Sequence, residues 1–274
     1  MTNHVAFPGL GLEFELNRVA FELFGRPIYW YAVIIATGFF LAVLYGMRRS
    51  REFGLDDDKI SGMLMIATPL AIVCARLYYV LFELDRYLDD PISMLYIWEG
   101  GIAIYGGIIG AIIGVYVYCK FKKIKVRKFV DVGALGLMIG QAIGRWGNFM
   151  NVEAYGGETT LPWRMEIPNG TYVHPTFLYE SLWNAAGFAI LHFYSKKRKF
   201  DGEIFLLYVA WYGLGRAIIE GFRTDSLYIP GTPIRVSQLL AGVSAVAAIA
   251  ALCYNYSKIK ENKIGGNNDE CSNN

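Results

Sequence analysis

A polar segment at the end of an apolar run is the part of the chain best suited to chemistry. Residues 144–156 read G-R-W-G-N-F-M-N-V-E-A-Y-G, which places Arg145, Asn148, Asn151 and Glu153 close together. An arginine at membrane depth costs at least about 2.5 kcal/mol on insertion scales, so a charge in such a run is expected to have a function. We therefore expect this segment to face a polar cavity or to bind an anionic partner.

Two further cations lie inside apolar runs. Arg216 and Glu220 are four residues apart, so they share one helix face and can pair with each other. Pure self-neutralisation would explain that pair alone, but Arg145 with its amides offers more donors than one glutamate can occupy, and Arg76 adds a third guanidinium. Arginine grips phosphate with two parallel hydrogen bonds. These residues are therefore suited to binding a phosphate group, and in a membrane the lipid head groups carry phosphate.

The composition indicates that these charges lie in a membrane protein. Of 274 residues, 54% are hydrophobic and 18% are charged, and a soluble domain of this length would carry more charge. Apolar runs of about 20 residues recur, the length that a helix needs to cross a bilayer core. We predict an all-α polytopic membrane protein with seven transmembrane helices at 28–47, 60–82, 94–118, 129–149, 176–194, 204–222 and 236–256.

The positions of lysine and arginine predict the orientation. Basic residues are concentrated after the first, third, fifth and seventh spans and are sparse in the other loops. Basic loops are retained on the cytoplasmic side. We therefore expect the N-terminus outside and the C-terminus inside, with 151–175 as the largest outer loop.

The segments outside the spans suggest a small outer head. In the N-terminal arm, 1–27, apolar and polar residues alternate on either side of Asn17-Arg18, which predicts a short hairpin. Pro168-Asn169-Gly170 predicts a second turn between alternating segments of the outer loop. The catalytic membrane domain is then 28–256, and 257–274 is predicted to be a disordered cytoplasmic tail because it is too polar to bury a core.

Glycine and histidine add smaller expectations. Gly144, Gly147, Gly156 and Gly157 would let the backbone approach a ligand or pack closely, whereas the spacing of Gly106, Gly110 and Gly114 favours close helix packing. His174 precedes the fifth span, where ordering of the outer loop is favoured over catalysis. It has no neighbouring ligands of the zinc type, so we expect no metal and no other cofactor.

The motifs match a known family. Residues 144–156 closely resemble the signature of the bacterial phosphatidylglycerol–prolipoprotein diacylglyceryl transferases. Further blocks that are similar are Y-W-Y in the first span, W-E-G-G-I-A-I-Y-G-G-I-I-G in the third, H-P-T-F-L-Y-E entering the fifth and Y-G-L-G-R-A-I-I-E-G-F-R-T-D in the sixth. The resemblance covers nearly the whole chain up to about residue 256.

The resemblance implies an enzyme that moves the sn-1,2-diacylglyceryl group of phosphatidylglycerol onto the lipobox cysteine thiol of a prolipoprotein, forming a thioether and releasing glycerol phosphate. By motif position, Arg145 and Arg216 resemble the family's essential arginines. The other matching positions are Asn148, Glu153 and Gly156 in the signature, Glu220 and Tyr212 in the sixth span, Tyr31 in the first, and His174. With Asn151 and Arg76, these residues make up the predicted substrate-binding and catalytic set.

One position departs from the family pattern. Many members have histidine in a span-three H-G-G motif, often discussed as the base, and this chain has Tyr105 before Gly106-Gly107. An unperturbed tyrosine titrates near 10, so Tyr105 suits hydrogen bonding or positioning better than proton removal. The thiol proton could instead pass to Glu153, Glu220 or water, or the arginine field could lower the pKa of the thiol.

Other functional classes were weighed against the transferase. A transporter for an anionic or lipid-like substrate also buries Arg/Glu clusters, but it should show paired interrupted spans, and we find no convincing internal repeat. An intramembrane serine protease is a third possibility, but this sequence contains no G-x-S-x-G nucleophile elbow. We therefore predict a monomer in the bacterial cytoplasmic membrane that contacts the lipid bilayer, phosphatidylglycerol and prolipoprotein signal peptides, and no nucleic acid.

Overall fold

The computed structural model describes residues 2–88, 90–97 and 100–271, with side chains as far as residue 262. Contacts divide the chain into unit 1, Met1–Tyr45 with Gly133–Asn274, and unit 2, Gly46–Val132. The long helices are α1 (Trp30–Arg49), α2 (Asp57–Phe82), α3 (Ile104–Lys122), α4 (Val126–Asn151), α5 (Thr176–Tyr194), α6 (Glu203–Ile219) and α7 (Val236–Cys271). The short 3-10 helices are η1 (Pro8–Leu10), η2 (Ser50–Phe53), η3 (Leu84–Tyr87), η4 (Pro91–Leu95), η6 (Ser195–Lys197) and η7 (Glu220–Phe222).

Each predicted apolar run contains one long helix. Among the described residues, five helical segments are long and apolar enough to cross a membrane, namely 30–53, 57–82, 104–122, 203–222 and 236–262. The helices α4 and α5 are more polar, because α4 carries Asp131, Gln141 and Arg145, and α5 carries Glu180 and Asn184. The chain is therefore a mostly helical, polytopic membrane protein.

The structure differs from the prediction at two boundaries. The third apolar run was expected to be helical from residue 94, but α3 begins at Ile104, because Gly100 and Gly101 adopt φ values of 93° and 75° that break a right-handed helix. The chain from 257 was expected to be disordered, but α7 continues to Cys271. In its first part, Lys258, Lys260 and Glu261 favour a helix. Residues 272–274 lie outside the described part of the chain.

The N-terminal arm and the loop between α4 and α5 form a four-stranded sheet in unit 1, with the order β2-β1-β5-β6. Its strands are β1 (Thr2–Phe7), β2 (Leu12–Asn17), β5 (Met165–Glu166) and β6 (Tyr172–Val173). The turn predicted at Pro168-Asn169-Gly170 is confirmed, since β5 and β6 pair antiparallel across it and Gly170 has a φ of 79°.

The hairpin predicted at Asn17-Arg18 was wrong. β2 pairs instead with β1, and β3 (Val19–Leu23) pairs with β4 (Arg26–Tyr29) in a separate two-stranded sheet. The reversals occur where the backbone can take a positive φ: Gly11 has a φ of 64°, and Phe24 and Gly25 have values of 49° and 74°. Asn17 and Arg18 are thus the link between two hairpins.

The four-stranded sheet packs on the ends of α4 and α5. Its buried core is made of Val5, Phe7, Leu16, Phe149, Met165, Ile167, Val173 and Phe177. Phe149 of α4 stacks on Phe177 of α5 with ring centroids 4.7 Å apart. This core fixes the last turn of α4 beside the first turn of α5.

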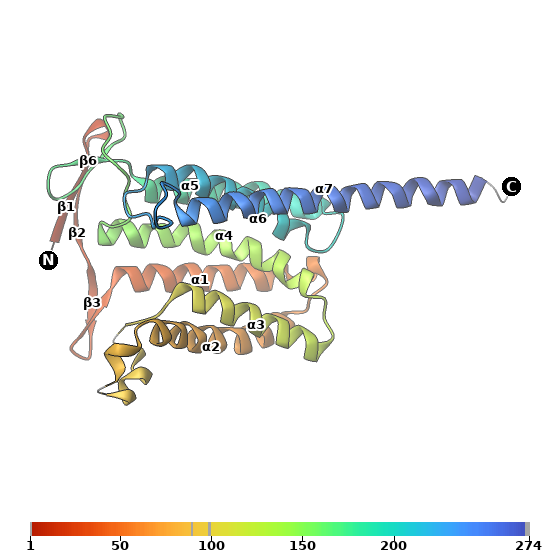
Figure 1. Cartoon of the computed structure of the whole chain (residues 1–274), viewed down its shortest axis with the longest axis horizontal. Coiled ribbons are helices and arrows are strands. Elements are labelled where there is room, and N and C mark those ends of the chain that lie inside the picture. Colours follow the sequence, from red (N-terminus) through yellow and green to blue (C-terminus); the bar gives the residue numbers. More distant parts are fainter. Residues whose placement is uncertain (1, 89, 98–99, 272–274) are drawn as a thin grey trace. The chain divides into compact units, whose positions relative to one another are not determined.

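In unit 1, α6 packs against both α5 and α7, and the three helices run along the same part of the view in Figure 1. Between α5 and α6, the rings of Trp183 and Trp211 stack 4.6 Å apart, and each indole N–H donates to the backbone carbonyl of the other residue at 3.0 Å. Gly187 and Gly215 leave space for these rings, because a Cβ at either position would meet an indole nitrogen within 2.3 Å. The tryptophan pair therefore fixes the rotation of α5 against α6.

In unit 2, α2 and α3 pack closely through small residues. A Cβ at Gly106, Gly110 or Gly114 would come within 2.4–2.6 Å of the α2 backbone. The prediction that these three glycines serve helix packing is confirmed.

Candidate active site

The signature segment ends α4 and turns the chain sharply. Val152 and Ala154 have φ values of 53° and 56°, a left-handed conformation that side chains rarely adopt. The reversal is held by two hydrogen bonds: the Glu153 amide donates to the Asn148 carbonyl at 3.1 Å, and the Thr176 hydroxyl donates to the Ala154 carbonyl at 2.5 Å. Such strain is often found at functional sites.

Three predicted residues form a small polar group at this turn. One carboxylate oxygen of Glu153 accepts hydrogen bonds from the side-chain amides of Asn148 at 3.0 Å and Asn151 at 3.2 Å. The Asn151 carbonyl accepts a hydrogen bond from Arg18 at 2.7 Å, which ties the N-terminal arm to the signature. Glu153 itself is exposed.

Glu180 of α5 is the centre of a buried charge cluster. Its Oε2 lies 2.6 Å from Nη2 of Arg145, and its Oε1 accepts from Arg216 at 2.8 Å and from Arg223 at 3.3 Å. The Glu180 side chain is 3% exposed. Three guanidiniums from separate parts of the chain thus converge on one carboxylate, and that arrangement compensates for burying it.

The cluster continues along α6 and η7. Arg216 Nη2 lies 2.6 Å from Glu220, which confirms the predicted pair, and Ser226 donates to the other oxygen of Glu220 at 2.8 Å. Arg223 also makes two hydrogen bonds to Asp225, at 2.9 and 2.7 Å. With the 3.4 Å hydrogen bond from Arg145 to Asn148, a continuous chain of polar contacts runs from Glu153 to Asp225.

The three arginines differ in how far their donors are occupied. Both terminal amino groups of Arg216 face carboxylates, and Arg223 uses three of its nitrogens on Glu180 and Asp225. Arg145 makes one ion pair and one long hydrogen bond to an amide, and its side chain is the most exposed of the three at 22%, against 16% and 10%. Arg145 is therefore the guanidinium best placed to accept an anionic ligand.

The charge balance at the site favours an anion. Three guanidiniums face two buried carboxylates, and the third acid, Asp225, has a side chain that is 49% exposed. Interactions with the exposed carboxylate are screened by solvent more strongly than those inside the cluster. The buried part of the site thus keeps an excess of positive charge.

Gly156 and Gly157 lie where the signature meets two other segments. Gly156 donates to the His174 carbonyl at 2.9 Å, and Gly157 donates to the Phe222 carbonyl at 2.8 Å. A Cβ on Gly156 would come within 2.7 Å of the His174 Cβ and 2.8 Å of the Phe222 oxygen, whereas one on Gly157 would have 3.9 Å of clearance. Gly156 is therefore required for close packing of backbone segments at the site.

The two predicted tyrosines of unit 1 contact helices at the site. The Tyr31 ring lies against Gly147, where an added Cβ would meet it at 2.8 Å, so this residue packs one face of α4 near Arg145. Tyr212 lies one helical turn before Arg216 and stacks on Tyr208 with centroids 5.8 Å apart. Tyr31 thus lies against the helix that carries Arg145, and Tyr212 lies on the helix that carries Arg216. No hydrogen bond from either hydroxyl is found in the described chain.

Arg76 and Tyr105, two further predicted site residues, belong to unit 2. Arg76 donates to the backbone carbonyls of Ser93, Met94, Gly100 and Gly101 at 2.7–2.9 Å. These bonds use four of the five N–H donors of a guanidinium. Arg76 thus holds the connection between α2 and α3, while Tyr105 is 52% exposed on the first turn of α3.

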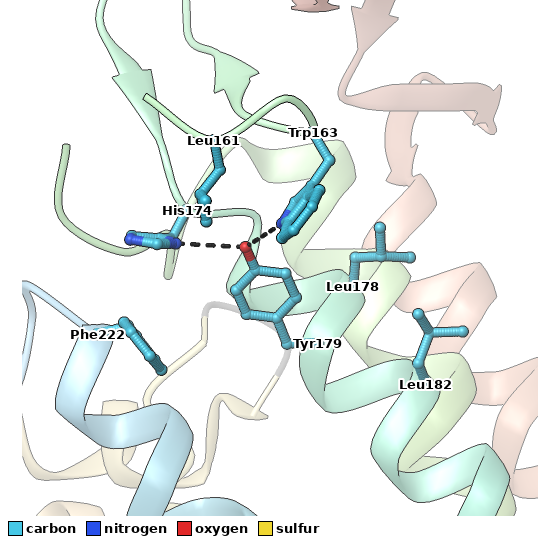
Figure 2. Close-up of a pocket in the computed structure, with 7 residues that line it drawn as sticks. All are labelled: Leu161, Trp163, His174, Leu178, Tyr179, Leu182 and Phe222. Carbon is cyan, nitrogen blue, oxygen red and sulfur yellow. Dashed lines mark hydrogen bonds between the residues drawn. The ribbon is translucent and has the colours of Figure 1, made fainter. Parts of the chain in front are cut away.

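An apolar groove of about 490 Å³ lies beside the signature in unit 1 (Figure 2). His174 and Tyr179 line it, and the Tyr179 hydroxyl lies 3.3 Å from His174 Nδ1 and accepts from Trp163 Nε1 at 2.8 Å. Burial lowers the pKa of His174 below its ordinary value of 6.5, so the ring is mostly neutral at neutral pH. These contacts agree with a loop-ordering role for His174.

Sequence reasoning missed two members of the cluster. Glu180 was noted in the H-P-T-F-L-Y-E block but not placed at the site, although a single carboxylate inside an apolar span requires a partner. Arg223 was not among the predicted site residues, although it lies seven residues after Arg216 and three after Glu220, a spacing that places residues on one helix face. Within the described residues, no group of three His, Cys, Asp or Glu side chains could hold a metal ion.

Comparison with known proteins identifies the family of this chain. The family model described as prolipoprotein diacylglyceryl transferase matches residues 18–254. Curated proteins named phosphatidylglycerol–prolipoprotein diacylglyceryl transferase are similar over most of their length. One from Lysinibacillus sphaericus is 41% identical over 91% of this chain and 96% of its own, and one from Enterococcus faecalis is 46% identical over 86% and 89%. Another, from Clostridioides difficile, is 40% identical over 90% and 98%. The chain belongs to the prolipoprotein diacylglyceryl transferase family.

Proposed function

We propose that this protein transfers the diacylglyceryl group of phosphatidylglycerol to the lipobox cysteine of prolipoproteins, and that the Arg145 cluster is its active site. Relatives that carry this activity in their name align over most of the chain. The main support for placing the active site at this cluster is the convergence of Arg145, Arg216 and Arg223 on the buried Glu180. The transporter and protease alternatives have no comparable support.

The reaction exchanges a carbon–oxygen bond for a carbon–sulfur bond. The cysteine thiolate attacks the glycerol carbon that carries the phosphate, and the electron pair of the broken bond leaves with the phosphate oxygen. The thiol proton goes to a base. The phosphodiester carries one negative charge, and the released glycerol phosphate approaches two at neutral pH. Groups that bind the developing charge therefore stabilise the transition state more than the bound lipid.

Arg145 is assigned to the phosphate because it has spare donors and the most exposed guanidinium of the cluster. Glu180 holds Arg145 and Arg216 in position, and Asn148 links Arg145 to Glu153. The exposed carboxylate of Glu153 is the more accessible of the two proposed proton acceptors, since Glu220 is already paired with Arg216 and Ser226. Asn151, Tyr31 and Tyr212 shape the site around this contact.

The proposal includes an arrangement in the bacterial cytoplasmic membrane. Seven spans with the N-terminus outside would place the signature and the four-stranded sheet on the outer side, as the distribution of basic residues predicts. Lipid would enter laterally from the bilayer, and the signal peptide would dock near the outer leaflet. The protein is proposed to act as a monomer, without metal or cofactor.

The test is transfer of labelled diacylglyceryl from phosphatidylglycerol to a lipobox peptide by purified protein. Arg145→Ala and a peptide with serine in place of cysteine are the controls. Labelled peptide that is lost in both controls supports the proposal. A well-folded wild-type protein that labels no peptide would contradict the transferase and would favour transport.

A further inference from the structure

The lining of the apolar groove beside the signature offers few groups that could form a hydrogen bond with a ligand. Leu161, Leu178, Leu182 and Phe222 contribute carbon atoms alone to it. Trp163 donates its indole N–H to the Tyr179 hydroxyl, and that hydroxyl also faces His174 Nδ1, so these three polar atoms satisfy one another, as Figure 2 shows. The second ring nitrogen of His174 points away from Tyr179 and Trp163 in the same view. An occupant of this groove therefore gains van der Waals contacts and few hydrogen bonds.

The groove is continuous in the chain with the charge cluster. Tyr179 directly precedes Glu180 on α5, and Phe222 directly precedes Arg223. The backbone ladder from Gly156 to His174 and from Gly157 to Phe222 joins both lining segments to the signature. A ligand with a charged end at the arginines thus has an apolar surface available on the adjoining faces of the same elements.

The groove is open and accessible from the side of α5. Leu182 and Trp163 are 60% and 44% exposed, so a ligand can reach the groove past these two residues. Its volume of about 490 Å³ falls within the range of roughly 300–1,000 Å³ typical of ligand pockets.

We propose that this groove binds one acyl chain of the donor phospholipid and so orients its glycerol carbon at the charge cluster. A hydrocarbon chain fits better than a peptide, because an extended peptide would bring backbone N–H and C=O groups against a lining whose polar atoms are already paired. In a bilayer the chain gains little from leaving lipid for an apolar groove. The groove therefore contributes mainly orientation and selectivity for chain length. This inference rests on the proposed transferase function.

The first experiment compares donor lipids of different chain length. Leu182→Trp adds bulk at the exposed edge of the groove, and Ile190→Trp, at a position that is 53% exposed on the same helix, adds the same ring away from it. We expect Leu182→Trp to lower kcat/KM for dipalmitoyl phosphatidylglycerol about tenfold through KM, and to change the value for the dioctanoyl lipid less than about twofold. Ile190→Trp should leave both unchanged.

Two results would overturn the proposal. An equal loss of kcat/KM with both lipids would show that the groove does not distinguish donor lipids by acyl-chain length. A loss that depends on the size of the apolar residues in the acceptor peptide would assign the groove to the precursor.

A second measurement does not depend on catalysis. Phosphatidylglycerol with brominated acyl chains quenches tryptophan fluorescence at short range, so the quenching lost in Trp163→Phe reports occupancy of the groove. In detergent-solubilised protein, we expect Trp163→Phe to show less quenching than wild type. We expect this difference to be smaller when both proteins also carry Leu182→Trp, so that the added tryptophan is present in both. Quenching without any transferase activity would retain the groove and reject the proposed function, whereas activity without quenching at Trp163 would reject the groove alone.

Discussion

Nη2 of Arg145 lies 2.6 Å from Oε2 of Glu180, so the arginine of the signature is held by a carboxylate on the next helix. The other oxygen of Glu180 holds Arg216 and Arg223. One buried acid thus sets the positions of three cations, and its neutralisation would affect all of them.

Glu180→Gln is expected to lower kcat/KM at least about a hundredfold, because the three guanidiniums lose their common partner and the preorganisation of the site. Breaking a buried ion pair on one side also destabilises a protein by about 3–5 kcal/mol. Lipid transfer and thermal unfolding in detergent measure the two effects. Glu166→Gln, on strand β5 outside the charge cluster, is the control, and an equally large loss there would indicate a non-specific effect.

Arg145 and Arg216 are expected to differ when each is replaced by alanine. Arg216 neutralises two buried carboxylates, so its loss should cost about 3–5 kcal/mol of unfolding free energy as well as activity. Arg145 is more exposed, and Arg145→Ala should abolish transfer with a much smaller change in Tm. Arg145→Lys should remain impaired because lysine cannot make the bidentate contact to a phosphate. Full activity of Arg145→Lys would contradict this role.

Gly156→Ala and Gly157→Ala form a matched pair. The added methyl group at Gly156 would lie 2.7 Å from the His174 Cβ, whereas that at Gly157 has 3.9 Å of clearance. Overpacking of this kind costs typically about 1–3 kcal/mol. We expect Gly156→Ala to lose stability and activity and Gly157→Ala to retain both. Comparable Tm values for the two variants would count against the close packing at Gly156.

Tyr105→Phe tests the position where many relatives carry histidine. If the hydroxyl positions substrate through a hydrogen bond, kcat/KM should fall about tenfold. Unchanged activity would exclude a catalytic hydroxyl at Tyr105.

The Arg223–Asp225 pair predicts a pH dependence of stability. Burial raises the pKa of Asp225, but the hydrogen bonds and charge of Arg223 outweigh it, so the pKa is lowered overall. The stabilisation from this pair is then present above the unfolded pKa of about 3.9 and is lost as the pH falls below it. Thermal unfolding should show wild type above Asp225→Asn at neutral pH, with the difference closing in acid. A constant difference would contradict the linkage.

Features that depend on residues close together in the chain were predictable from the order of amino acids alone. Apolar runs of sufficient length specified the helices, because a helix satisfies its backbone hydrogen bonds internally. The spacing of Arg216 and Glu220 on one helix predicted their pairing, and Pro168-Asn169-Gly170 predicted a turn that the structure contains. Each of these depends only on residues that are close together in the sequence.

Contacts between residues far apart in the chain followed only from the packing of whole helices and strands. Glu180 became the centre of the cluster because the stacked Trp183 and Trp211 fix the rotation of α5 against α6, and no local period encodes that rotation. The strands of the arm paired in two separate hairpins for a similar reason, since β1 is held by β5 from the loop after α4. Contacts between segments far apart depend on how whole faces pack, and the alternation of residues within one segment does not specify its partner.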